Sequence, residues 1–136
     1  MNDEIIRKSL ASTNFDAFFH GSEGEPEKFA VAYLNDDERA LLNCKSDTIW
    51  LSRQSLDEHK AKHPEVGIED YRAIPDIIRQ AEIWHGQGTK RYLLLWIGEK
   101  PYRAAVKTDV HGNDAWFLSL IISGKQKPPK GAVRVR

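Results

Sequence analysis

The feature that most constrains the fold is a run of three apolar segments between Arg91 and Gly124, RYLLLWIGEKPYRAAVKTDVHGNDAWFLSLIISG. Each segment is rich in aromatic and branched residues, and the linkers GEKP and VHGND are typical of turns. No helix of ordinary length fits between these breakers. The sequence therefore predicts an antiparallel meander, and Glu82–Gly86 is a candidate fourth strand at its edge.

The first hairpin of the meander predicts which side chains share a face. With Glu99-Lys100 as a two-residue turn, one face pairs Trp96 with Arg103, Leu94 with Ala105 and Tyr92 with Lys107. The opposite face pairs Ile97 with Tyr102, Leu95 with Ala104 and Leu93 with Val106. This second face is uniformly apolar, so we expect it to contact the helices. A shift of one residue would exchange the two faces.

The chain before the meander is predicted to be mainly helical. Asn35 and Glu38 have the spacing of a capping box, because a short side chain can accept the third amide while the glutamate reaches back. Pro64 and Pro75 interrupt helical geometry at or just before their own positions. The candidate elements are helices over 3–11, 36–43, 55–63 and 68–81, a strand over 47–52, and a segment over 28–34 that fits either a strand or a helix.

Together these elements predict an α+β fold in which helices pack on one face of a four-stranded antiparallel sheet. A chain of 136 residues is long enough for one domain with a real core. Residues 1–47 would be an N-terminal extension, residues 48–124 the core, and residues 125–136 a basic tail. The tail sequence KQKPPKGAVRVR has five basic groups and no acidic ones, and its Pro-Pro pair favours an extended conformation.

Composition excludes several classes of protein. No apolar stretch approaches the roughly 18 residues of a membrane span. The first ten residues, MNDEIIRKSL, mix charges with apolar residues and lack the apolar segment of a secretory signal. The single cysteine, Cys44, excludes an internal disulfide and points to a cytoplasmic protein. Net charge is zero, but residues 1–68 carry eight basic and 13 acidic groups, and residues 69–136 carry 12 and seven. This asymmetry allows a local site for an anionic ligand, or reflects solvated charges alone.

Lys107 is the first candidate for chemistry. On its predicted face it lies among Tyr92 and Trp96, with Arg103 four residues earlier on the same side. Cations beside aromatic rings suit a phosphodiester with an adjacent unstacked base. The alternative is that Arg103 and Lys107 only keep one sheet face soluble.

Ser119 and two histidines are further candidates. Ser119 interrupts the apolar run WFLSLIIS. It shares a face with Lys107 if the HGN loop has an odd length, for example with a bulge at Gly112, and not if the length is even. Ser119 also fits a purely structural hydroxyl. His59 and His63 lie four residues apart on one helix, but no glutamate follows the first and no third ligand is evident, so no metal is expected. His63 ends the helix, where the dipole favours the imidazolium, or it caps the helix carbonyls.

The order of these motifs resembles a known superfamily. IWLS, a helix ending in KHPE, the segment EDYRAIPDIIRQAE, and strands with YRAAVKT and FLSLI are similar to the phage and prophage nuclease-like domains of the barnase–EndoU–colicin–RelE superfamily. The resemblance covers about Thr48 to Ser123. It implies a metal-independent ribonuclease with no cofactor, in which a ribose 2′-hydroxyl attacks phosphorus and leaves a cyclic phosphate.

The resemblance also implies roles for particular residues. His63 would transfer protons, Lys107 would stabilise transition-state charge, and Ser119 or Thr108 would orient the phosphate. The substrate-binding group would comprise His59, Tyr92, Trp96, Arg103 and Thr108. No Glu–Arg–His set of the barnase type is present.

A second hypothesis is a non-enzymatic phage accessory or structural module that keeps the same fold. The four tryptophans are numerous enough for an exposed aromatic patch at a protein interface. The expected partners are RNA under the first hypothesis, with a phage or immunity protein as the other option, and no membrane under either. The location would be the cytoplasm or the phage particle.

Overall fold

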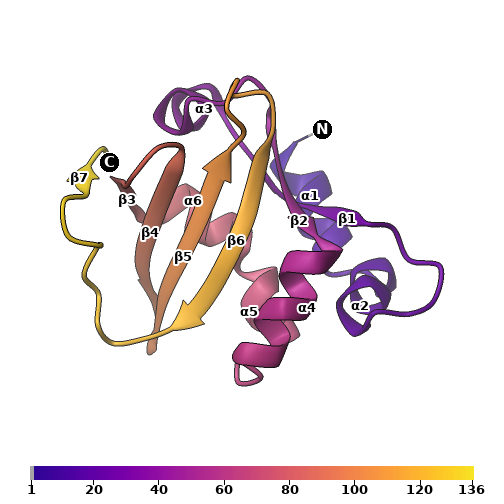
Figure 1. The fold of residues 1–136 in the computed structure, drawn as a ribbon. Coiled ribbons are helices and arrows are strands. Elements are labelled where there is room, and N and C mark those ends of the chain that lie inside the picture. The colour runs from indigo at the N-terminus through magenta and orange to yellow at the C-terminus, as the bar shows by residue number, and fades with distance from the viewer. Residues whose placement is uncertain (1) are drawn as a thin grey trace.

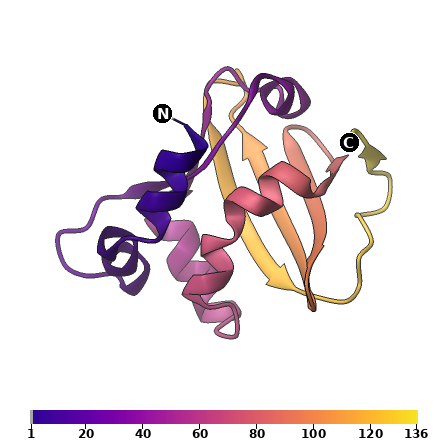
Figure 2. The same cartoon turned by 180° about the vertical axis from the view of Figure 1, so that it is seen from behind.

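The computed structural model describes residues 2–136, which form one seven-stranded sheet with helices packed against it (Figures 1 and 2). The helices are α1 (Asp3–Leu10), α2 (Thr13–His20), α3 (Asp36–Leu42), α4 (Arg53–Lys62), α5 (Ile68–Arg72) and α6 (Ile74–Gln80). The strands are β1 (Lys28–Tyr33), β2 (Thr48–Ser52), β3 (Glu82–His85), β4 (Lys90–Ile97), β5 (Lys100–Thr108), β6 (Ala115–Ile122) and β7 (Val133–Arg134). Across the sheet the order is β1-β2-β6-β5-β4-β3-β7.

The prediction of a four-stranded antiparallel sheet is wrong, because the sheet is mixed and continues past β3 and β6. β3, β4, β5 and β6 pair antiparallel in succession. Beyond β3 lies β7, and beyond β6 lies β2, which pairs parallel through Ile49–Ala115 and Trp50–Trp116. β1 then pairs antiparallel with β2. A parallel pair joins strands that are distant in the chain, so local turn signals do not reveal it.

The β4–β5 hairpin has the predicted faces but a different register. Its turn is Gly98-Glu99, because Ile97 pairs with Lys100, and Gly98 has φ 57°. A positive φ at the first central residue is the hairpin geometry that favours glycine. Tyr92 is therefore opposite Ala105, a shift of two residues from the prediction. A shift of two preserves the faces, whereas a shift of one would exchange them.

A bulge in β6 determines where Ser119 lies. Val106 pairs with Phe117 and Ala105 with Ser119, so Leu118 is an extra residue in β6. The preceding loop has an even length, 109–114, for which the sequence predicted opposite faces for Lys107 and Ser119. That rule fails because the bulge lies within β6 rather than in the loop and reverses the alternation after Phe117. Ser119 therefore shares a face with Ala105 and Lys107.

α3, α4 and the region over 68–81 follow the predicted start and stop signals to within two residues, whereas α2 was not predicted. Asn35 and Glu38 form the expected capping box at α3, with Glu38 N donating to Asn35 Oδ1 at 2.8 Å. α4 begins after Ser52, whose hydroxyl accepts from Ser55 N, and it ends before Pro64. The region over 68–81 is split into α5 and α6, with Pro75 in the first turn of α6.

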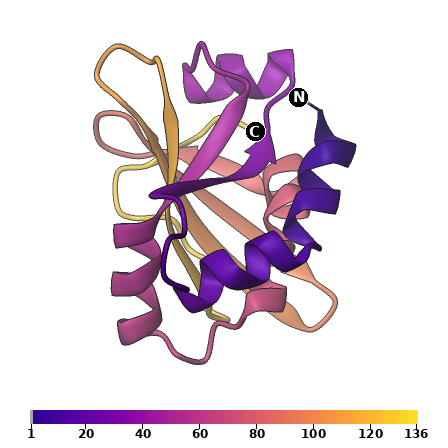
Figure 3. The ribbon, with the colours of Figure 1, turned by 90° about the vertical axis from the view of Figure 1, so that its right-hand side faces the viewer.

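The N-terminal segment contributes to the same core as the meander. Phe15 and Phe18 of α2 and Val31 of β1 have no exposed surface, and they belong to the cluster that includes Phe117 and Leu120 of β6. Viewed from the side, α4 is separated from α1 by the strands (Figure 3). Within residues 2–136, no helix has the length and apolar character needed to cross a bilayer.

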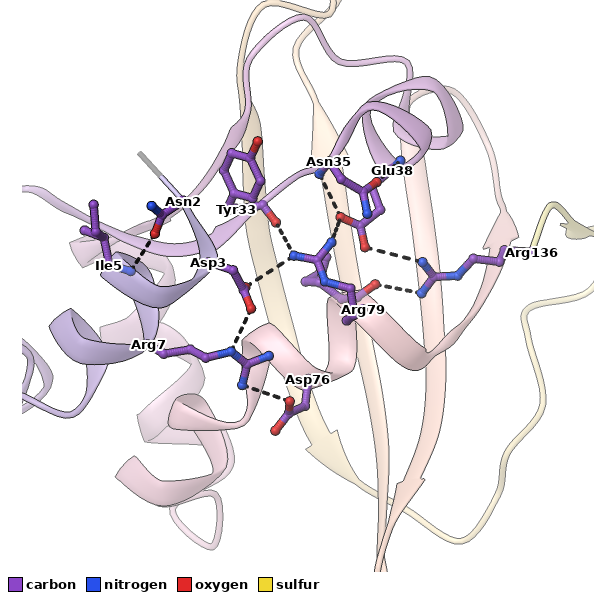
Figure 4. Close-up of polar contacts among 11 residues, drawn as sticks. Asn2, Asp3, Ile5, Arg7, Tyr33, Asn35, Glu38, Asp76, Arg79 and Arg136 are labelled. Atoms are coloured by element: carbon purple, nitrogen blue, oxygen red, sulfur yellow. Dashed lines mark hydrogen bonds and ion pairs between the residues drawn. The ribbon is translucent and has the colours of Figure 1, made fainter.

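A buried carboxylate connects α1, α3, α6 and the C-terminal segment (Figure 4). Glu38 is 1% exposed and accepts from Asn35 N and from the guanidinium of Arg79. Arg136 Nη1 lies 3.5 Å from its other oxygen, Glu38 Oε2. Arg79 also donates to Asp3 at 3.3 Å. A buried charge of this kind is tolerated because opposite charges surround it.

The substitution Glu38→Gln tests this network. It keeps the size and the capping oxygen but leaves two arginines without their carboxylate, so we expect the free energy of unfolding to fall by about 3 kcal/mol. Urea denaturation followed by tryptophan fluorescence measures the change. The matched control is Asp36→Asn, which removes an exposed carboxylate paired with Arg39 in the same helical turn and should alter the midpoint little. Equal effects of the two substitutions would contradict the role given to Glu38.

Candidate functional site

The sheet has an open face, defined as the face turned away from α6 and formed by Tyr92, Lys107 and the residues in register with them (Figure 1). Across neighbouring strands, Trp50 is paired with Trp116, Trp116 with Lys107, and Lys107 with Lys90. We call these four residues the Trp–Lys row. The next row contains Ser119, Ala105, Tyr92 and Trp84. Aromatic and cationic side chains thus lie side by side on one surface.

A cavity of about 700 Å³ opens at the Lys90 end of this row. One wall is the turn between β3 and β4, the floor includes Tyr92 and Lys107, and the other wall is the tail before β7. The lining residues are Gly86, Gln87, Gly88, Thr89, Lys90, Tyr92, Lys107, Pro129, Lys130, Gly131 and Ala132. Figure 1 shows this tail running from the end of β6 around the outside of β4 to β7.

The cavity is positively charged. Its lining contains Lys90, Lys107 and Lys130 and no carboxylate. Within residues 2–136, the ion pairs use other cations, so none of these three ammonium groups is neutralised by an acidic neighbour. Three such charges lining one cavity produce a field that attracts anions.

Gly86 allows the ring of Tyr92 to take its place in the floor of the cavity. A Cβ atom added at Gly86 would overlap the ring of Tyr92. Gly86 N donates to Lys90 O at 3.0 Å, so the backbone continues the β3–β4 ladder while the ring packs against it. The glycine here is needed for close approach rather than for an unusual backbone angle.

A second, shallower hollow of about 140 Å³ lies next to the cavity. It contains Ser119, Arg103 and Leu94, and Tyr92 borders both hollows. Arg103 donates to the carbonyl of Lys127 at 3.0 Å, which attaches the start of the tail to β5.

The structure brings together some of the predicted site residues. Tyr92 and Lys107 share the cavity, and Ser119 and Arg103 share the second hollow. Trp96 is on the same face and 55% exposed, but it lies beside the hairpin turn, at the opposite end of β4 from Lys90. Thr108 is 4% exposed, and it follows Lys107 and so points to the other face.

His59 has a structural environment. It is 8% exposed, its Nε2 accepts from Leu120 N at 3.2 Å, and its Nδ1 lies 2.7 Å from Tyr71 Oη. An Nε2 that accepts must be unprotonated, so Nδ1 carries the hydrogen. Burial lowers the pKa of His59, which favours this neutral form. Its imidazole therefore satisfies a backbone amide at the edge of β6.

His63 is not near Lys107. It follows the last residue of α4, where its Nδ1 lies 3.2 Å from Glu65 Oε1 and its ring lies 4.9 Å from that of His59. In Figure 1, α4 runs toward the end of the sheet where β6 finishes, whereas Lys107 is close to the arrowhead of β5 at the other end. His63 lines neither hollow, so the three catalytic candidates do not face one space.

Sequence reasoning missed Lys90, Thr89 and Lys130 as site residues. The basic tail and the glycine-rich turn GQGTK were visible in the sequence. What was missing was that β7 returns the tail to β3 and so places Lys130 beside the turn. Within residues 2–136, no cluster of three or more His, Cys, Asp or Glu side chains is arranged to hold a metal ion.

Searches against protein families, curated proteins and solved structures found no match to this chain. The resemblance to the barnase–EndoU–colicin–RelE superfamily therefore stays a prediction from short motifs.

The neutral state of His59 predicts a pH dependence of stability. Because its pKa is below the ordinary 6.5 in the folded protein, the unfolded chain binds the proton first as pH falls. The contribution of neutral His59 to the free energy of unfolding should be fully present above about pH 6.5 and should decrease below that pH. Urea unfolding at pH 7.5 and 5.5 should show a larger loss for the wild type than for His59→Gln. An equal loss in the two proteins would show that His59 does not cause this pH dependence. His111→Gln is the control, because His111 is exposed and its replacement should leave the wild-type loss unchanged.

Proposed function

We propose that the open face binds single-stranded RNA, with phosphates on the lysines and bases on the aromatic rings. The observation that carries the proposal is the Trp–Lys row, in which two indoles and two ammonium groups occupy four successive strands. Strands are about 4.8 Å apart, so the row extends over roughly 15 Å. Sequence-tolerant binding of single strands uses this combination of stacking surfaces and cations.

The pairing of Lys107 with Lys90 supports an anionic ligand. The two residues are directly opposite each other on adjacent strands. Like charges in this position destabilise a sheet, and no carboxylate lines the cavity they share. A bound phosphate would relieve the repulsion between them.

The aromatic end of the row also carries positive charge. Lys28 Nζ lies 4.2 Å from the centroid of the Trp50 ring and 5.7 Å from that of Trp116. Lys28 therefore lies over one face of the Trp50 ring, and Lys107 is opposite Trp116 on the neighbouring strand. A strand lying along the row would have a cation within reach on either side of the stacked bases.

The proposal is limited to binding. Acid–base cleavage requires groups within about 3 Å of the atoms they protonate or deprotonate. His63 and Lys107 lie toward opposite ends of the sheet, and Ser119 borders a different hollow from Lys107. The choice of RNA over DNA depends on the sequence resemblance to ribonuclease-like domains, so a DNA strand of the same sequence belongs in every binding experiment.

Lys107→Gln tests the electrostatic part of the proposal. Removing one phosphate contact should weaken binding of a fluorescent oligouridine about five- to tenfold. It should also reduce the slope of log affinity against log salt by about 0.7. Fluorescence anisotropy at several salt concentrations measures both quantities. Lys8→Gln removes the same charge from α1, where it pairs with Glu4, and should change neither. No binding of RNA by the wild type would refute the proposal and favour a protein-interaction module.

Trp116→Leu tests the stacking part. The row predicts a loss of about 1–3 kcal/mol of binding free energy for one lost base stack. Trp96→Leu is the matched control because Trp96 is on the same face but outside the row, and it should leave affinity within about twofold of wild type. A larger loss of affinity for Trp96→Leu than for Trp116→Leu in the same assay would show that the bases stack near the hairpin turn instead.

A further inference from the structure

We propose that the cavity beside Lys90 binds a terminal phosphate monoester, so that the protein prefers a phosphorylated strand end to the interior of a strand. This inference depends on the proposed function, since it names the part of the RNA that occupies one end of the Trp–Lys row. The cavity, its charge and its closed side each support it.

The closed side is the tail from Pro129 to Ala132. Continuing the row past Lys90 leads to Gly86, the residue after β3, whose amide donates to Lys90 O. The next segment is the tail, because Val133 pairs with His85, the residue just before Gly86. Residues 129–132 therefore stand across the path of a strand that follows the row. A strand can end in the cavity but would have to turn away sharply to continue.

The charge of the cavity suits a monoester better than a diester. A terminal monoester carries about −1.5 to −2 at neutral pH, whereas an internal diester carries one negative charge. The cavity has three ammonium groups and no carboxylate. Lysine binds phosphate as a point charge without a fixed geometry. The hydroxyl group of Thr89, in the turn between β3 and β4, adds a hydrogen-bond donor to the lining of the cavity.

The wall that carries Lys130 is held by the segment that follows it. Val135 N donates to Ile83 O at 2.8 Å, and Arg136 donates to Ile78 O and Ala81 O at 2.6 and 2.8 Å. Arg136 also lies beside buried Glu38. These contacts keep the tail along β3, so the cavity exists without a ligand.

Anisotropy competition with unlabelled octauridines tests the inference. The arms are a 5′-phosphorylated strand, a 3′-phosphorylated strand and a strand with two hydroxyl ends. One phosphorylated arm should compete at least about tenfold better than the hydroxyl-ended strand, and which arm does so identifies the end. Lys130→Gln should abolish this difference, while Lys125→Gln, a tail residue outside the cavity, should preserve it.

The outcomes separate the two proposals. Equal competition by all three arms would overturn the end preference and leave RNA binding intact. A preference that persists in Lys130→Gln would also overturn it, because the phosphate would then be bound elsewhere. Failure of all arms to compete, with no binding of the labelled strand, would remove the proposed function itself.

Discussion

The buried carboxylate of Glu38 is the interaction on which the arrangement of the molecule depends. It is almost fully enclosed, yet it is charged and contacts the guanidinium groups of Arg79 and Arg136. One guanidinium comes from α6 and the other from the segment after β7, and Arg79 extends the network to Asp3 in α1 (Figure 4). Because an unpaired charge in this position would be costly, the network favours the arrangement in which the four segments meet.

This network also explains why a surface cavity has a defined shape. A two-residue strand such as β7 is too short to hold a tail by its ladder alone. Arg136 adds three hydrogen bonds to backbone carbonyls at the end of α6. The wall of the cavity that carries Lys130 is thus anchored on the far side of the sheet, by residues that do not line the cavity.

Local patterns predicted some parts of the fold well and others not at all. Alternation in β4 and β5 assigned the faces correctly, because the buried face of this hairpin is mostly apolar and polar exceptions such as Arg91 and Thr108 are few. The predicted register was wrong because the turn is Gly98-Glu99 rather than Glu99-Lys100: glycine readily adopts the positive φ that the turn requires, and lysine does not. The parallel β2–β6 pair and the return of the tail to β3 were missed because both depend on contacts between distant segments. The lining of the cavity contains Lys107, whose sheet face was predicted from the sequence, and Lys130, whose position on the tail wall was not.

The short contact between β2 and β6 has a consequence for how this protein avoids self-association. Only two residue pairs join these strands. Without other cover, the rest of this edge of β6 would have unpaired backbone amides that another chain could bind. α4 occupies that position instead, and the imidazole of His59 takes the amide hydrogen of Leu120 in place of a neighbouring carbonyl. The His59 side chain thus replaces the hydrogen bond that a further strand would make. It blocks an edge of β6 at which other chains could otherwise pair and form fibrils.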